Sequence, residues 1–530
     1  MLHTGNTAAN INGAVIAGMV TANDTDPNST VVAIGNGVYG TAAFNPETGE
    51  VTYTLNDNAA SQMGAGTNQV TDTITYTAMD SNGNTYEKTI EIVVVRQTSG
   101  SGQYIADNQV EGELHLVTVE TTGDGETGTP EIALSDGDDM LIGMKLMEDM
   151  EIDLGGGNNR FTLTVASGNA LSGTAVSAGN GNNRIDIQGA GTALTHSSQL
   201  TLGDGDNTVS LSGTRAIFDN SGIIVGNGNN TITLNGGMEG FNRGDESFIR
   251  TGDGDNEIVI TGSAGFYGMS YGQIETGAGD DVIRVKASGQ TAVSNYSSIN
   301  AGDGNNIIEV EGLRGLDTNS SITAGSGDDT ITVTGTGGYG MYNSTITTGE
   351  GDDYVYVKGS LTNSKVWLGD GDDRLYLDSE GLRNMLAGNS ILDGGANTLV
   401  DFGRGELGDV LSLGHDLAVA VNGTNALGGI TSGNVTGFEA LHLDLFDGGA
   451  DTLDIDQLLS TLSSKGFTGE KAFDSIVITG DQADTLLFTG EWTSSGQNVI
   501  LDGFDGVTFD RFTVMNGQEV LEIYLQTGIA

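Results

Sequence analysis

The chain of 530 residues contains no cysteine, only 3 prolines and only 19 Lys and Arg residues. The absence of cysteine excludes disulfides, cysteine-ligated zinc, iron–sulfur clusters and thiol catalysis. Against 71 Asp and Glu residues, the few basic residues leave a formal net charge of −52. Such a charge argues against binding nucleic acid or an anionic membrane through a basic surface.

Two further features are missing from the sequence. No apolar run reaches the ~18 residues of a membrane-spanning helix, so we expect no membrane insertion. The first residues, Met-Leu-His-Thr-Gly-Asn, lack the basic and apolar regions of a secretory signal peptide. If the protein is exported, it therefore uses another route, or its signal lies outside this sequence.

Glycine is abundant, with 85 residues, and much of it belongs to a repeated motif. The motif is Gly-x-Gly followed by two Asp or Asn residues. Ten copies begin at residues 155, 179, 203, 226, 252, 277, 302, 325, 349 and 369, and a degenerate copy begins at 135. The intervals of 20 to 26 residues predict a repeat architecture.

Apolar and polar residues alternate after each motif, as in Ile331-Thr-Val333 and Val355-Tyr-Val357. A second pattern, Ser-x-Ile, precedes several motifs, for example at Ile299 and Ile322. A period of two is typical of a strand with one buried face, and stacked repeats can bury faces that a single repeat cannot. For residues 131–390 we therefore predict an all-β, right-handed, β-roll-like parallel β-solenoid of about 24 residues per coil. Each coil is predicted to contain strand, acidic turn, strand and a variable return loop.

The glycine-rich turns have the composition of calcium sites. Alternate glycines permit positive φ, so successive carbonyl oxygens can converge, and Asp and Asn add side-chain oxygens. Calcium accepts about six to eight such oxygens. A stacked column of bare carboxylates would repel itself, and a cation between coils would turn that repulsion into cross-linking. The predicted ligands of several calcium ions are Asp138, Asp139, Gly203, Asp204, Gly205, Asp206, Asn207, Gly252, Asp253, Gly254, Asp255, Asn256, Gly277, Gly279, Asp280, Asp281, Gly302, Asp303, Asn305, Asn306, Gly325, Gly327, Asp328, Asp329, Gly349, Gly351, Asp352, Asp353, Gly369, Asp370, Gly371, Asp372 and Asp373.

The turns are not equally acidic. Four motifs, beginning at 155, 179, 226 and 302, end in two Asn residues, whereas the motifs beginning at 277, 325, 349 and 369 end in two Asp residues. The Asp turns are the best predicted ligands. The alternative for the Asn turns is a metal-free turn held by a ladder of stacked Asn side chains.

The motif Gly277-Ala-Gly279-Asp-Asp281-Val-Ile283 resembles the RTX nonapeptide, GGxGxDxUx, of secreted bacterial toxins, proteases and adhesins, without its first glycine. The Asp of that pattern is Asn at positions 159, 183, 207, 230, 256 and 306, and the period is longer than a coil of two nonapeptides. The resemblance implies secretion and a calcium-lined edge on one side of the solenoid. It implies no particular activity.

Residues 1–96 are predicted to form a separate all-β domain. Asn23-Asp24-Thr-Asp26-Pro27 and Asp80-Ser-Asn-Gly83 resemble parts of the cadherin-like and VCBS modules of bacterial adhesins, which are immunoglobulin-like β-sandwiches. The resemblance implies Asp24, Asp26 and Asp80 as further calcium ligands, and solvated turn formers are the alternative. Residues 97–130 are predicted to be a linker that leads into the first coil.

Residues 391–530 are predicted to form a mainly β cap on the last coil. Gly437-Phe-Glu-Ala-Leu-His-Leu-Asp444, followed by Asp451-Thr-Leu-Asp-Ile455, resembles the C-terminal module of RTX adhesins. That resemblance implies an uncleaved C-terminal signal for type I secretion machinery. Residues 456–462 give the best predicted helix, with Asp456 as N-cap and Gly466 just past the end.

No catalytic constellation stands out. The five His residues form no zinc motif, and the string Gly268-Met-Ser270-Tyr-Gly272 is expected from composition and lacks the strand–turn–helix context of a hydrolase. Acidic pairs recur in every turn, whereas a catalytic pair should be unique. We therefore predict that the protein is not an enzyme and has no organic cofactor.

These observations predict a secreted or surface protein of a Gram-negative-type bacterium. It would bind calcium and form or decorate extracellular structures such as biofilm matrix, filaments or a surface layer, by self-association or by contact with polysaccharide or a host surface. One alternative is a polysaccharide lyase on a solenoid scaffold, although basic residues concentrate only at Arg284/Lys286 and Lys358/Lys365. Another is a carbohydrate-binding spacer that uses Tyr354, Tyr356, Trp367 and Tyr376.

Overall fold

The computed structural model divides into two units, residues 1–253 and residues 254–530, and each is described by itself. The described residues are 15–19, 30–45, 50–55, 69–79, 82–95, 104–105, 115–119, 131–134, 136–143, 146–239, 247–262, 265–378, 386–396, 407–414, 418, 430–446, 450–468, 473–489, 493–504, 506–516 and 519–529.

The first unit begins with antiparallel strands in two sheets. Strands β1 (Val15–Met19), β4 (Glu50–Leu55) and β3 (Gly40–Asn45) form one sheet in the order β1-β4-β3. Strand β2 (Thr30–Ile34) pairs with β5 (Gln69–Met79), which pairs with β6 (Thr85–Val95) along its whole length. In β5, Ile74 and Tyr76 are buried while Thr73 and Thr75 are exposed. The arrangement agrees with the predicted sandwich.

Parallel pairing starts within the segment that was predicted to lead into the solenoid. Strand β8 (His115–Val119) runs parallel to both β6 and β10 (Asp139–Gly143). Strand β7 (Tyr104–Ile105) runs parallel to β9 (Glu131–Ala133).

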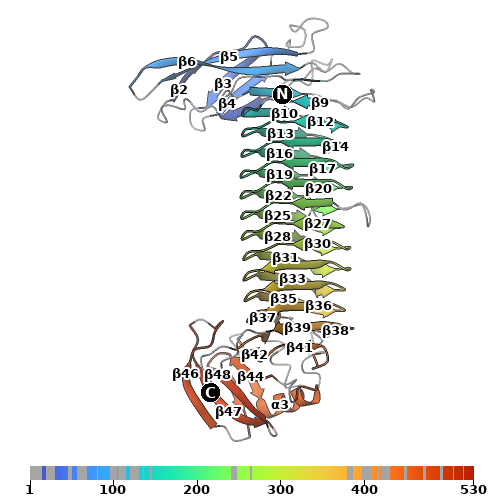
Figure 1. Cartoon of the computed structure of the whole chain (residues 1–530), viewed down its shortest axis with the longest axis vertical. Helices are drawn as coiled ribbons and strands as arrows, with labels where there is room; N and C mark the ends of the chain where they lie inside the picture. Colours follow the sequence, from blue (N-terminus) through green and yellow to red (C-terminus); the bar gives the residue numbers. More distant parts are fainter. Residues whose placement is uncertain are drawn as a thin grey trace. The chain divides into compact units, whose positions relative to one another are not determined.

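Each coil of the first unit contributes strands to three parallel stacks (Figure 1). The stack that follows the glycine-rich turns contains β10, β13 (Arg160–Val165), β16 (Arg184–Gly189), β19 (Thr208–Ser212) and β22 (Thr231–Asn235). The stack that precedes them contains β9, β12 (Glu151–Asp153), β15 (Ala175–Ala178), β18 (Gln199–Leu202), β21 (Gly222–Val225) and β24 (Ser247–Arg250). The third contains β11 (Met147–Glu148), β14 (Leu171–Ser172), β17 (Thr192–Thr195), β20 (Arg215–Phe218) and β23 (Met238–Glu239).

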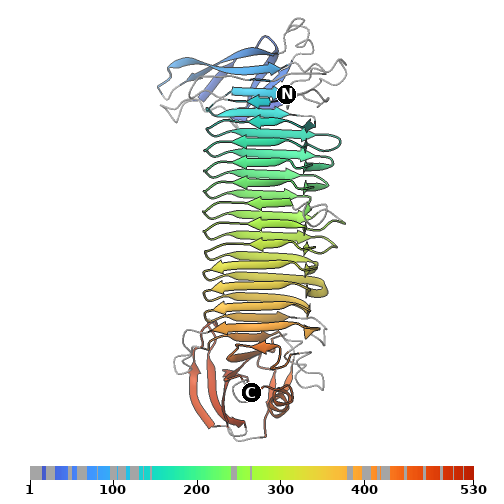
Figure 2. The ribbon, with the colours of Figure 1, turned by 45° about the vertical axis from the view of Figure 1, so that its right-hand side comes forward.

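The second unit repeats this coil (Figure 2). After the turns lie β25 (Glu257–Gly262), β28 (Val282–Ala287), β31 (Ile307–Asp317), β33 (Thr330–Tyr342), β35 (Tyr354–Thr362) and β37 (Arg374–Asp378). Before them lie β27 (Gly272–Glu275), β30 (Ser298–Asn300), β32 (Ser321–Ser326), β34 (Thr345–Glu350), β36 (Lys365–Asp370), β39 (Ile391–Ala396) and β41 (Val435–Thr436). On the third side, β26 (Met269–Ser270) pairs with β29 (Val293–Ser294), and β38 (Leu386–Ala387) pairs with the end of β35.

The buried residues are those of the predicted alternation. Ile331, Val355 and Leu375 align in register in adjacent coils and are fully buried, as are the corresponding residues of the first unit. The parallel β-solenoid of about 10 turns and about 24 residues per coil is thus confirmed. One detail of the prediction was wrong, because the return segment contains a third short strand. Thr192-Ala-Leu-Thr195 is buried at all four positions, and no alternation marks it.

Parallel pairing continues past residue 390. Strands β40 (Val410–Leu413), β42 (Ala440–Asp444), β44 (Ser475–Thr479) and β48 (Glu519–Gln526) extend the sheet from β37. Strand β47 (Phe509–Asn516) pairs antiparallel with β48 on one side and with β46 (Thr493–Val499) on the other. Strands β43 (Thr452–Asp454) and β45 (Thr485–Leu487) form a separate pair.

Helix α3 (Ile455–Ser464) confirms the predicted helix but not its cap. The N-cap is Asp454, whose carboxylate accepts a hydrogen bond from the Gln457 amide, and Asp456 lies in the first turn. Gly466 follows the end of the helix with a φ of +92°, as its position predicted.

Candidate metal-binding turns

The two Asp or Asn residues that close each glycine-rich motif have different environments. The first is on the surface, as for Asp206 and Asp352, and the second is buried, as for Asn207 and Asp353. The difference arises because the second residue directly precedes the next strand and follows the same alternation of buried and exposed side chains. Each coil therefore places one Asp or Asn side chain inside the turn.

Within each unit the buried residues form a column, and we call these residues the inner ladder. In each, the backbone N–H donates to Oδ1 of the inner-ladder residue in the next coil, at 2.8–3.1 Å. In the first unit the inner ladder consists of Asp139, Asn159, Asn183, Asn207 and Asn230. In the second unit it consists of Asn256, Asp281, Asn306, Asp329, Asp353 and Asp373.

An Asn in the inner ladder donates hydrogen bonds to the glycine carbonyl oxygens of its own turn. Nδ2 of Asn207 donates to the carbonyl oxygens of Gly203 and Gly205, at 3.0 and 2.9 Å, and to Oδ1 of Asn230 at 3.1 Å. Gly205 has a φ of +132°, and a Cβ there would lie 2.4 Å from the Gly181 carbonyl oxygen. The predicted convergence of glycine carbonyls is confirmed, and in these turns they converge on an amide donor.

An Asp in the inner ladder has no such donor. Oδ2 of Asp281, Asp329, Asp353 and Asp373 is buried and has no hydrogen-bond partner. This oxygen is the counterpart of the Asn Nδ2, because in both kinds of turn Oδ1 accepts the backbone bond of the ladder. The turns differ in their first glycine, which has a positive φ at Gly325, Gly349 and Gly369 but not at Gly179, Gly203 and Gly226. A buried carboxylate oxygen without a partner is stabilised by a cation or a proton.

The pKa values of these carboxyl groups reflect their position. Burial is the main cause that raises the pKa of Asp353 to about 6, of Asp329 to about 7 and of Asp373 to about 8. Burial also raises the pKa of Asp281. Repulsion from neighbouring carboxylates adds to the shift, for example from Asp353 onto Asp373. The charged state of the inner ladder is therefore disfavoured when no cation is bound.

The exposed residues of the motifs form a second column in which the bonds run in the opposite direction. The amide of Asp280 donates to Oδ1 of Asp255 in the preceding coil at 3.0 Å, and that of Asp372 donates to Oδ1 of Asp352 at 2.9 Å. Asp255, Asp280 and Asp352 are exposed and Asp372 is half-buried, so these carboxylates add negative charge at the rim of the turns.

The donor set of the Asp turns fits calcium. One buried carboxylate oxygen and glycine carbonyl oxygens are hard ligands, and water would have to complete the shell of about six to eight. In the part of the chain that the structure describes, no three His, Cys, Asp or Glu side chains converge on one point. Side chains alone therefore do not make the site. Asp24, Asp26 and Asp80 lie outside the described residues.

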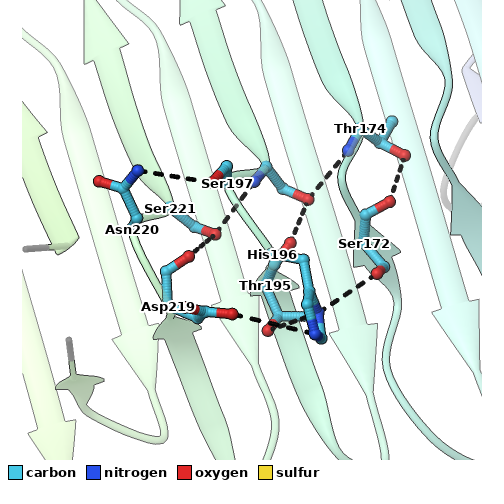
Figure 3. Close-up of polar contacts among 9 residues, drawn as sticks. Ser172, Thr174, Thr195, His196, Ser197, Asp219, Asn220 and Ser221 are labelled. Atoms are coloured by element: carbon cyan, nitrogen blue, oxygen red, sulfur yellow. Dashed lines mark hydrogen bonds and ion pairs between the residues drawn. The ribbon is translucent and has the colours of Figure 1, made fainter. Parts of the chain in front are cut away.

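A different ladder occupies the corner between the third strand and the strand that precedes the turn (Figure 3). The Thr174 amide donates to Oγ of Ser198 at 3.1 Å, and the Ser198 amide donates to Oγ of Ser221 at 3.0 Å. The pattern recurs in the second unit between Ser344, Ser364 and Ser390. These residues include the Ser of the Ser-x-Ile pattern, to which the sequence analysis gave no role. The ladder at this corner is made by hydroxyl groups, which carry no charge.

His196 at this corner lies between a Ser and an Asp. Its Nδ1 lies 3.4 Å from Oγ of Ser172 and its Nε2 lies 3.9 Å from Oδ2 of Asp219 (Figure 3). Both distances exceed the ~2.6–3.2 Å of a nucleophile and its base. Ser270, within the discounted Gly268–Gly272 string, is buried and accepts a bond from Asn295.

The basic and aromatic groups considered for the alternative functions mostly have partners within the fold. Arg284 bonds Glu309 and Glu257, at 2.8 and 3.1 Å. The rings of Tyr356 and Tyr376 stack at 5.5 Å, and their hydroxyl groups bond Asp378 and Asp444. Trp367 extends from the other sheet, beneath the Lys365 ammonium, so the four aromatic residues do not form one strip.

The inner ladder also continues beyond the motifs, which the sequence analysis missed. The Asp373 amide donates to Oδ1 of Asp409 at 2.8 Å. The available signal was Asp409-Val-Leu-Ser-Leu413, which has the same alternation as Asp373-Arg-Leu-Tyr-Leu377. The separation of 36 residues breaks the period, so a search for repeats does not reach it.

Comparison with known proteins identifies the first domain. Residues 3–93 match the family model of the bacterial Ig domain, which confirms the predicted immunoglobulin-like fold there. The match does not extend to the glycine-rich repeats. No curated protein and no solved structure matches the chain. The bacterial Ig domain indicates a surface or extracellular protein. None of the described helical segments has the length and apolar character needed to span a membrane.

Proposed function

We propose that the chain is a secreted, calcium-binding structural or adhesive protein whose solenoid is folded and rigidified by calcium. The observation that carries the proposal is the buried, unpartnered Oδ2 of Asp281, Asp329, Asp353 and Asp373. Each is the counterpart of an amide that, in the Asn turns, bonds the glycine carbonyls. Calcium at these places would supply the positive charge that the protein itself does not supply.

The energetic argument depends on how the carboxylates are stacked. Asp329, Asp353 and Asp373 follow one another in consecutive coils. At a strand spacing of about 4.8 Å and an effective dielectric constant of about 20, two neighbouring charges repel by about 3 kcal/mol. A divalent cation shared by two coils reverses the sign of this interaction, so its binding energy becomes folding energy.

This chemistry would couple folding to the environment. In a calcium-poor cytoplasm the acidic chain would remain loosely folded, which suits export by type I machinery. In the millimolar calcium outside the cell the coils would bind calcium and fold. The bacterial Ig domain supports an extracellular location, and the predicted polymer, matrix or surface-layer role builds on it.

The lyase alternative receives less support from the structure. A lyase would need a basic side chain free to act beside an acidic metal site. Arg284 and Lys286 form ion pairs with glutamates of adjacent strands, and Lys358 lies 3.9 Å from Asp378. These contacts give the basic residues a role in joining coils.

The test uses the purified full-length protein in millimolar calcium and in EGTA. We expect calcium to increase the far-UV β-signal and the melting temperature, and EGTA to reverse both. Electron microscopy of the same samples should show filaments or sheets only with calcium. An unchanged melting temperature would overturn calcium-dependent folding. Dispersed particles that cleave polysaccharide would overturn the structural role in favour of the lyase.

A further inference from the structure

One backbone position at the corner of the hydroxyl ladder has a positive φ in coil after coil. Directly before the serine of the corner, small polar residues, which tolerate this left-handed conformation, hold it in five coils. These are Ser197, Asn220, Asn319, Asn343 and Asn363. In two consecutive coils the position holds Tyr271 and Tyr296, with φ values of +50° and +61°. A bulky side chain is strained there, so the sequence keeps these two tyrosines at a cost in stability.

The two strained rings do not fill the core. Met269 and Val293, in the same two coils, are fully buried, whereas Tyr296 is 38% exposed and Tyr271 is half-buried. The rings stack on each other, with centroids 6.3 Å apart and planes inclined by 21°. One stacked pair offsets only part of the strain of two tyrosines. The remaining cost indicates that the rings serve a contact at the surface.

A second aromatic pair lies on the same side of the coils. The rings of Tyr339 and Tyr342 meet edge to face, with centroids 6.4 Å apart. The Arg314 guanidinium lies over both rings, 5.3 and 5.9 Å from their centroids, and Asp317 holds it by a 2.6 Å ion pair. Leu313, beside Arg314 in the chain, is 45% exposed, and Tyr339 is 41% exposed. The pair is thus ordered by its neighbours and still open to solvent.

Backbone hydrogen bonds connect the two pairs through one intervening coil. The Tyr296 amide donates to the Thr318 carbonyl at 2.9 Å, and the Thr318 amide donates to the Tyr342 carbonyl at 3.0 Å. At a strand spacing of about 4.8 Å, the surface from Tyr271 to Tyr342 extends ~14 Å along the solenoid axis. We call this surface the aromatic corner, and its residues are Tyr271, Tyr296, Leu313, Arg314, Tyr339 and Tyr342.

The aromatic corner is almost free of charge in a chain that carries 71 Asp and Glu residues. The return segments on this side of the coils are residues 265–271, 288–297, 312–320, 335–344 and 359–364. Their only charged residues are Arg314 and Asp317, which pair with each other. A charged polymer would find no free opposite charge here, and a polyanion would also be repelled by the net charge of −52. A neutral partner therefore suits this surface best.

The exposed apolar area is small for a protein partner. Tyr296, Leu313 and Tyr339 are 38 to 45% exposed and together present on the order of 300 Å². A stable protein–protein interface buries ~800 Å² on each partner. The area suits a few rings of a sugar chain, because the C–H faces of sugar rings stack on aromatic rings while their hydroxyl groups form hydrogen bonds.

We propose that the aromatic corner binds a neutral polysaccharide that lies along the solenoid axis. Tyr296 and Tyr339 stack against sugar rings, and Arg314 and the phenolic hydroxyl groups bond the sugar hydroxyls. Stacking and Arg314 already hold the rings in place, so little conformational entropy is lost on binding. The site deepens the adhesive part of the proposed function and depends on it only through the folded solenoid.

The test is affinity electrophoresis of the full chain in calcium-containing native gels. The gels contain hydroxyethyl cellulose, galactomannan or dextran as neutral probes, or alginate as an anionic probe. We expect at least one neutral probe to slow the protein and alginate to leave its mobility unchanged. No retardation by any neutral probe, or retardation by alginate alone, would overturn the proposal.

Two variants test the aromatic corner itself. Tyr296→Asn introduces the residue type that holds this position in other coils, so the fold should be kept, and Tyr339→Ala removes the second exposed ring. Each should raise the dissociation constant for the retarding probe at least about tenfold. The matched control is Trp367→Ala, because Trp367 is also 38% exposed but extends from the strand stack before the turns. It should bind as the unmodified chain does.

The results separate this site from the calcium sites and from self-association. Loss of retardation with an unchanged calcium-dependent melting temperature supports the aromatic corner. Retardation that survives both tyrosine variants, or that is lost in Trp367→Ala alone, would overturn it. Sedimentation measures association in the same buffer. Dimers that both tyrosine variants abolish, without retardation by any neutral probe, would assign the surface to a second copy of the chain and overturn the polysaccharide.

Discussion

The backbone N–H of Asp353 donates a 2.8 Å hydrogen bond to Oδ1 of Asp373, while the buried Oδ2 of Asp373 has no partner. The equivalent pair in the first unit, Asn183 and Asn207, makes the same backbone bond and adds a 3.0 Å bond from Nδ2 of Asn183. The same backbone hydrogen bond is thus made to either side chain, and the two side chains differ by a single group. The Asn side chain has its hydrogen-bond partners without a ligand, whereas one oxygen of the Asp side chain has none.

Replacing Asp by Asn in the inner ladder should stabilise the calcium-free protein. Asp329→Asn and Asp353→Asn remove a buried charge and supply a donor to the glycine carbonyls, so each should raise the free energy of unfolding in EGTA by about 1–3 kcal/mol. Denaturant unfolding measures this. The control is Asp352→Asn on the exposed rim, which should change stability by less than about 0.5 kcal/mol. Lower stability of the inner variants in EGTA would contradict the account.

The reverse change should create a calcium requirement where none is expected. Asn207→Asp removes the donor to Gly203 and Gly205 and should cost about 1–3 kcal/mol in EGTA. Calcium should recover most of that loss. Asn182→Asp, at an exposed position of the neighbouring turn, is the matched control. A loss of equal size with and without calcium would show that the inner Asp binds no metal.

The pH dependence without calcium follows from the raised pKa values. A carboxyl group whose pKa is higher in the folded chain than its usual value of about 4 binds more protons when folded, so stability falls as pH rises. With pKa values of about 6 for Asp353, 7 for Asp329 and 8 for Asp373, the contribution of these groups to stability in EGTA should be greatest below about pH 4 and should be lost as pH rises from about 4 to about 8.

Melting temperatures measured across this range provide the test. The net charge of −52 also favours stability at lower pH, so a variant with Asp281, Asp329, Asp353 and Asp373 all changed to Asn serves as the reference. It should show a shallower slope than the unmodified chain. Identical slopes would mean that the inner carboxylates do not titrate as described.

The hydroxyl ladder that includes Ser198 and Ser221 should contribute equally to the free energy of unfolding with and without calcium. Ser221 is fully buried, and its Oγ accepts the Ser198 amide at 3.0 Å. Ser221→Ala removes this bond and leaves the amide only its 3.2 Å bond to the Thr195 carbonyl, so it should cost about 0.5–1.5 kcal/mol in both conditions. Ser210→Ala, on an outward-facing strand position, should cost little. A calcium-dependent loss for Ser221→Ala would contradict the separation of the two corners.

Much of the coil could be predicted from the sequence because its signal is local. Ile331-Thr-Val333 alternates with a period of two, and both apolar side chains are fully buried. The third strand escaped prediction because segments such as residues 192–195 are buried throughout and carry no alternation. Their burial depends on the neighbouring coils, which the sequence of one coil does not describe.

Which of the two Asp or Asn residues in each turn is buried was harder to predict from the sequence. In Asp352-Asp353 the two residues are chemically identical, so composition treats them as equal ligands. The backbone path through Gly349 and Gly351, both with positive φ, places one outside and the other inside. Asp409 was missed for a related reason, because its coil breaks the period although its flanking alternation is intact.

The most direct test of the central claim is a crystal structure of the protein grown with excess calcium. The account predicts ordered calcium density beside Oδ2 of Asp281, Asp329, Asp353 and Asp373, and no calcium inside the turns of Asn159, Asn183, Asn207 and Asn230. Empty Asp turns, or calcium bound equally in the Asn turns, would contradict it.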